Sequence, residues 1–68
     1  MKARDLPTPG LRKVHETIRA ALREDDALEK RRRKPVYLAR SEVGWARWRD
    51  EVEAELERRG EIFVPIRL

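Results

Sequence analysis

Pro35 limits the possible folds of this chain more than any other residue, because it separates two segments with helical patterns. A proline lacks the N–H group that an inner helical turn needs, and the residue before it avoids helical backbone angles. A single helix through the whole chain is therefore excluded. The sequence predicts one helix before Pro35, a second helix after it, and a non-helical segment between them.

The first helix is predicted over residues 8–33. Thr8 is a candidate N-cap, and Pro9 suits the first helical position, where no N–H partner is lost. An apolar stripe then repeats at helical spacing. Its members are Leu11, Val14, Ile18, Ala21 and Leu22. Residues 1–7 before this helix are polar and short, and we expect them to be flexible.

Two acids fall on the apolar face of this helix. The helical wheel places Asp25 and Glu29 on the same side as the apolar stripe, and burying a pair of carboxylates there is costly. Either the buried part ends near Leu22, or the chain breaks at Asp25 and Asp26. Acid-before-base pairs four residues apart favour one long helix whose second half lies in solvent.

The rest of the chain predicts strand, helix and strand. Residues 35–39, "PVYLA", are rich in β-forming residues, and residues 61–68 alternate between two faces. The helix between them is predicted over residues 41–59, with Ser41 as its cap and Gly60 as its end. Its apolar stripe consists of Trp45, Trp48, Val52 and Leu56. In the last strand, the side chains of Ile62, Val64 and Ile66 point to one face. Together with the four stripe residues, they form the predicted core or interface.

The α-β-α-β order predicts an α+β or small α/β fold, with two helices packed on a short two-stranded sheet. Residues 8–68 then form one small domain. Two strands alone are not stable, and a chain of 68 residues without cysteine has a marginal core. We therefore expect a homodimer with a four-stranded sheet. The alternative is that the last strand adds to the sheet of a different protein.

Positive charge is concentrated in the middle of the chain. The net charge is +4, but residues 30–49 carry eight positive and one negative charge, whereas residues 50–61 are net negative. Five cations are consecutive: Lys30, Arg31, Arg32, Arg33 and Lys34. The ordinary interpretation is a solvated helix end, where cations are favoured by the helix dipole. The functional interpretations are contact with nucleic-acid phosphates or with an acidic protein partner.

Three further arginines are candidates for the same polyanion-binding surface. Arg40 precedes the second helix, close to its positive end. Arg47 and Arg49 are interleaved with Trp45 and Trp48, a pattern compatible with base stacking beside phosphate contacts. The helical wheel instead favours tryptophans that point inward and arginines that point outward.

The chain has no arrangement typical of an enzyme, a metal centre or a cofactor site. Its single histidine, His15, lies at the edge of the first apolar stripe and has no partners at metal-ligand spacing. Five acids of the second helix spread around it rather than converge, which predicts a solvated face that can meet the basic run of a second subunit. These are Asp50, Glu51, Glu53, Glu55 and Glu57.

The sequence predicts a cytoplasmic protein with no membrane partner, because it has neither an apolar run of about 20 residues nor a signal-peptide core. Thirteen arginines against four lysines are compatible with a bacterial, archaeal or phage source. Two functions fit the sequence. One is a small regulatory or accessory protein bound to DNA or RNA. The other is a protein-interaction module, such as an inhibitor, an adaptor, an antitoxin-like partner or a phage assembly component.

Overall fold

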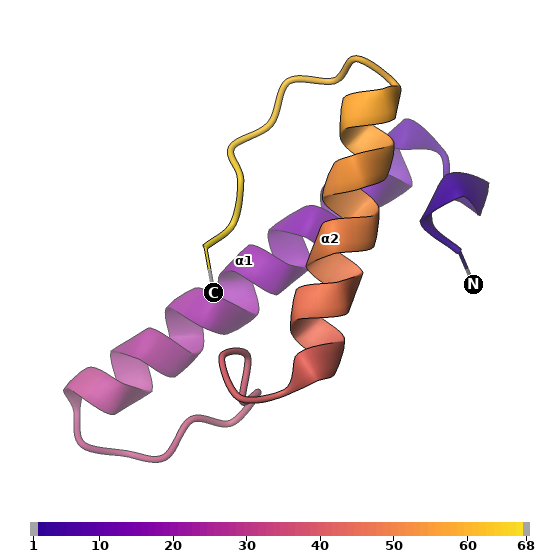
Figure 1. Ribbon diagram of the computed structural model, residues 1–68. Helices are drawn as coiled ribbons and strands as arrows, with labels where there is room; N and C mark the ends of the chain where they lie inside the picture. The colour runs from indigo at the N-terminus through magenta and orange to yellow at the C-terminus, as the bar shows by residue number, and fades with distance from the viewer. Residues whose placement is uncertain (1, 68) are drawn as a thin grey trace.

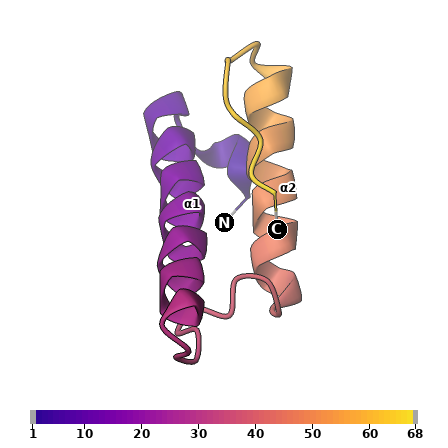
Figure 2. The same ribbon diagram turned by 90° about the vertical axis from the view of Figure 1, so that its left-hand side faces the viewer.

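The computed structural model describes residues 2–67 and shows two antiparallel helices joined by a long loop (Figure 1). A short 3-10 helix, η1, spans Ala3–Asp5 and precedes α1, which spans Thr8–Lys30. The second helix, α2, spans Val43–Arg58 and runs back beside α1 (Figure 2).

The predicted α+β fold is wrong, because residues 2–67 contain no β-strand. Residues 35–39 form a loop, and residues 61–67 form no strand pairing: the only bond from their backbone to another backbone group within residues 2–67 is that of the Glu61 N–H to the Leu56 carbonyl, at the end of α2. Pro35 and Pro65 each remove a donor that a sheet ladder needs, and two short strands have little stability of their own. Without strands in residues 2–67, the predicted four-stranded sheet of a homodimer is wrong as well. Leu68, the last residue of the predicted strand, lies outside the described residues.

The start of α1 differs in detail from the prediction. Pro7 is the N-cap and makes no side-chain cap bond, while Thr8 is already helical and Pro9 follows it. Proline in the first turn still loses no intrahelical hydrogen bond. The Thr8 hydroxyl instead accepts a hydrogen bond from Arg59, at the far end of α2, over 3.2 Å. The predicted cap residue therefore joins the two helices.

The helix α1 runs without a break through Asp25 and Asp26 and ends in a Schellman motif. Arg32 has a φ of 58°, its N–H donates to the Glu29 carbonyl, and the N–H of Arg33 donates to the Leu28 carbonyl. The helix therefore stops before Pro35 is reached, and the end of the basic run belongs to a tight left-handed turn.

The core lies where the stripes of the two helices meet near η1. Ala3, Leu11, Val52 and Leu56 form one buried cluster. Partly buried apolar residues pack around it: Leu6, Val14, Trp48 and Phe63. Two residues after the end of α2, Gly60 has a φ of 73°, which allows the N–H of Glu61 to donate to the Leu56 carbonyl.

The two ends of the chain cover opposite faces of the helix pair. In Figure 2, η1 lies behind the helices, and the C-terminal segment, residues 61–67, passes in front of them. Among residues 2–67, neither helix has the length and apolar character needed to cross a membrane.

Candidate functional site

The basic run forms an exposed tip at the end of α1 (Figure 1). We call residues 30–34 the basic tip; all five side chains are exposed. Within the described part of the chain, none of them takes part in an ion pair. The left-handed turn at Arg32 sends the chain back towards α2, so the basic tip includes the last residue of α1 and the turn that follows it.

The three other candidate arginines have different surroundings. Arg40 makes a two-pronged contact with Asp26, at 3.2 and 3.1 Å, and this carboxylate raises the pKa of the guanidinium. Arg49 contacts Asp50 and donates to the Ile66 carbonyl over 3.2 Å. Arg47 is exposed and makes no ion pair within residues 2–67. The acids therefore neutralise Arg40 and Arg49, and the strongest uncompensated charge lies on the basic tip.

A buried carboxylate fixes the loop that follows the basic tip. The Asp25 side chain accepts hydrogen bonds from the backbone N–H groups of Val36, Tyr37 and Ala39, over 3.1, 3.0 and 2.9 Å. Burial alone raises the pKa of Asp25, but these backbone donors outweigh burial and lower the pKa below its ordinary value. Asp25 is therefore a charged anchor for residues 35–39, which we call the anchored loop.

The sequence does not predict this anchor. The helical wheel places Asp25 on the apolar face, where burial of its carboxylate is expected to be costly. Three amides of a loop ten or more residues away remove that cost, because a carboxylate with several backbone donors is stable when buried. Two features of the sequence point to the anchor. Asp25 is in line with an apolar stripe, and it is followed by a loop that begins with a proline and whose N–H groups have no helical partner.

Aromatic residues gather beside the anchored loop. The Trp45 indole N–H donates to the Tyr37 carbonyl over 3.0 Å, and the two rings meet edge to face with centroids 6.1 Å apart. Both predicted core tryptophans are half-buried, and Trp48 reaches the core cluster. An open cleft of about 290 Å³ lies between them, lined by Trp45, Trp48, Glu42 and Gly44. We call it the indole cleft.

The structure divides the other predicted core residues into two groups. Val52, Leu56 and Ile66 are buried, with 0%, 0% and 6% of their surface exposed. Ile62 and Val64 are 90% and 68% exposed. The alternation predicted for a strand placed all three C-terminal residues on one buried face, but the segment has no sheet to hold that geometry.

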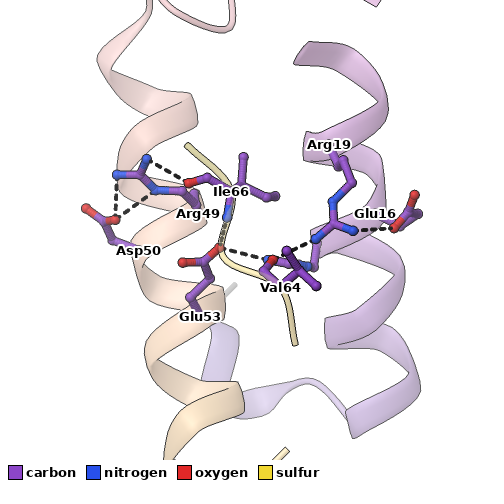
Figure 3. A network of polar contacts seen from close by, with 8 residues as sticks. Glu16, Arg19, Arg49, Asp50, Glu53, Val64 and Ile66 are labelled. Atoms are coloured by element: carbon purple, nitrogen blue, oxygen red, sulfur yellow. Dashed lines mark hydrogen bonds and ion pairs between the residues drawn. The ribbon is translucent and has the colours of Figure 1, made fainter. Parts of the chain in front are cut away.

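Side chains from both helices hold the C-terminal segment (Figure 3). Arg19 of α1 donates to the Val64 carbonyl over 2.7 Å. Glu53 of α2 accepts the Ile66 N–H over 2.8 Å, and the same carboxylate oxygen lies 2.8 Å from the ring Nε2 of His15. His15 is buried and packs edge to face on Phe63. Glu53 was predicted to be solvated, but it connects α1, α2 and the C-terminal segment.

A second buried acid, Glu55, pairs with an arginine that contacts the N-terminal residues. Glu55 is 7% exposed and is paired with Arg58 and Arg59. Hydrogen bonds from these two arginines lower the pKa of Glu55 from 4.5 to about 2. Arg59 also donates to the carbonyls of Arg4 and Leu6, over 3.2 and 2.7 Å. Of the five acids in α2, Glu53 and Glu55 therefore stabilise the fold, and the other three are exposed.

We expect the stability of the protein to fall in acid. Asp25 and Glu55 both have a lower pKa in the folded state than in the unfolded state, so the unfolded chain binds more protons at low pH. The stabilisation is complete above about pH 5 and is lost as the pH falls from about 4.5 to 2. The melting temperature, followed by circular dichroism, should fall by roughly 10 °C over that range. A Glu55→Gln variant should show a smaller fall, and a wild-type melting temperature that is constant down to pH 2 would contradict this prediction.

Comparison of the chain with protein-family models, with curated proteins and with solved structures finds no match.

Proposed function

We propose that this protein is a small, non-enzymatic nucleic-acid-associated protein, regulatory or accessory in role, that contacts phosphates through the basic tip. The single observation that carries the proposal is the exposure of five consecutive cations without ion-pair partners within residues 2–67. A helix dipole is compensated by one or two cations in its last turn. The remaining positive charge at the tip is available to a polyanion. A nucleic-acid partner implies a cytoplasmic location, which is part of the proposal.

The pairing of the other arginines supports the tip as the contact surface. Arg40 and Arg49 are held by Asp26 and Asp50, so recruiting them for a phosphate requires an existing contact to break. The cations of the basic tip have no ion pair within residues 2–67 that must break before they bind a phosphate. Each phosphate that it neutralises releases condensed counterions, so binding should weaken steeply as salt is added.

The test compares charge removal at the tip with the same charge removal elsewhere on α1. Arg31→Gln with Arg33→Gln removes two tip cations, and Lys13→Gln with Arg23→Gln removes two exposed cations along the same helix. Affinity for labelled DNA and RNA is measured by fluorescence anisotropy at several salt concentrations. The tip variant should lower the slope of log affinity against log salt by about 2, and the affinity at low salt by about tenfold or more.

The control variant should keep a slope within about half a unit of the wild type, because its changes lie away from the tip. Equal slopes for both variants, or no binding by the wild type at low salt, would overturn the proposal. Light scattering on the same samples gives the mass of the free protein and of the complex.

A second candidate function is a protein-interaction module, favoured by exposed apolar side chains. Ile62 is 90% exposed, Val36 71%, Val64 68% and Val43 63%. The extended C-terminal segment presents two of them on a backbone held by side chains rather than by a sheet. Self-association into a homodimer, or binding to an acidic protein, would cover such residues. Dimerisation or partner binding that survives high salt favours this candidate over nucleic acid, because apolar contacts are not screened.

A further inference from the structure

The anchored loop presents apolar and aromatic side chains directly beside the basic tip. Tyr37 is 42% exposed, and its neighbours Val36 and Leu38 are 71% and 39% exposed. Lys34, the last cation of the tip, precedes Tyr37 by three residues. An extended chain of this length spans at most about 11 Å. A phosphate on the tip and a base on the tyrosine ring can therefore belong to neighbouring nucleotides.

The tyrosine is held in position before any ligand arrives. Asp25 accepts its backbone N–H over 3.0 Å, and the Trp45 indole donates to its carbonyl over 3.0 Å. The Tyr37 ring packs edge to face on the indole, with an interplanar angle of 84°. A ring fixed in this way loses little conformational freedom when a ligand stacks on it, so more of the stacking energy appears as affinity.

The indole cleft adjoins this surface through Trp45, which lines the cleft and also contacts Tyr37. Two indoles line it, and a Cβ placed on Gly44 would meet no atom within 4 Å, so the cleft is open at that residue. Glu42 places a carboxylate side chain in its lining. A phosphate is repelled there, whereas the amino groups of cytosine or adenine are suitable donors to the carboxylate. The cleft therefore favours a base, and the tip favours the backbone.

We infer that the basic tip, Tyr37 and the indole cleft form one continuous surface for single-stranded nucleic acid. Phosphates lie on the tip, one base stacks on Tyr37, and a following base enters the cleft beside Trp45. This inference rests on the proposed function and adds the strandedness of the ligand. A duplex offers phosphates to the tip, but its bases stay stacked on one another and give the aromatic residues nothing to bind.

The test measures binding of single-stranded and duplex oligonucleotides of the same sequence to the wild type, Tyr37→Ala and Tyr37→Phe. The wild type should bind the single strand at least tenfold more tightly than the duplex, and only the single strand should quench the fluorescence of Trp45 and Trp48. Tyr37→Ala should lose roughly 5- to 100-fold in single-strand affinity, because stacking on one aromatic side chain contributes that much. Tyr37→Phe, which keeps the ring, should stay within about threefold of the wild type.

The salt dependence distinguishes the failure of this inference from the failure of the proposed function. Tyr37→Ala should keep the wild-type salt slope, because it removes no phosphate contact, whereas Arg31→Gln with Arg33→Gln should lower it. Equal single-strand affinity of Tyr37→Ala and the wild type would overturn the inference and leave the tip as a phosphate site. Binding of vesicles of phosphatidylserine and phosphatidylcholine, without binding of either oligonucleotide, would overturn both. The Tyr37 side chain makes no hydrogen bond within residues 2–67, and circular dichroism checks that both variants fold.

Discussion

Replacing Asp25 with alanine is expected to lower the melting temperature by roughly 10–20 °C. The substitution removes the acceptor of three backbone N–H groups and leaves at least the buried N–H of Ala39 without a partner. In a domain of this size, each kilocalorie of lost stability moves the melting temperature by about 4–8 °C. Thermal unfolding followed by circular dichroism measures the change, which we expect to include loss of order in the anchored loop.

Two further variants separate the role of the Asp25 charge from that of a surface acid. Asp26→Ala changes the next residue, whose side chain is 40% exposed and paired with Arg40, and should lower the melting temperature by no more than about 3 °C. Asp25→Asn keeps the shape but turns an amide NH2 towards backbone donors, so it should be destabilising as well. Equal melting temperatures for Asp25→Ala and Asp26→Ala would show that the anchor contributes nothing.

Replacing Leu56 with alanine is expected to cost about 2–5 kcal/mol of unfolding free energy, because Leu56 is 0% exposed in the core cluster. A chain of 68 residues has a total stability of roughly 3–10 kcal/mol. The variant therefore loses a large part of its stability and should be partly unfolded at low urea concentrations. Urea titration followed by circular dichroism gives the free energy directly.

The matched control for Leu56 is Ile62→Ala, which removes a similar volume from a residue that is 90% exposed. Its cost should lie within about 0.5 kcal/mol of zero, as for other surface substitutions. This pair also distinguishes the two-helix structure from the predicted sheet, in which Ile62 belongs to the buried face. A cost at Ile62 comparable to that at Leu56 would contradict the observed arrangement.

The candidate site illustrates which properties depend on the order of residues alone. Five adjacent cations before Pro35 must lie together at the surface, because no nearby set of acids is large enough to neutralise them. The helical spacing of the tryptophans is visible in the sequence and predicts that they belong to the core or an interface, with base stacking as the alternative. Tyr37 lies in the predicted strand 35–39 without any feature that singles it out, because its position depends on contacts with Asp25 and Trp45 that no local pattern reveals.

The two helices, the position of the basic tip and the absence of disulfides follow from the amino-acid sequence alone. Helical periodicity, prolines near residue 8 and glycine at residue 60 act over a few residues, so they can be read locally. The conformation of residues 35–39 and 61–67 depends instead on contacts with distant parts of the chain. Both segments have the composition of strands, but a strand needs a partner backbone, and here Asp25, Glu53 and the arginines of the helices bind their N–H and C=O groups instead.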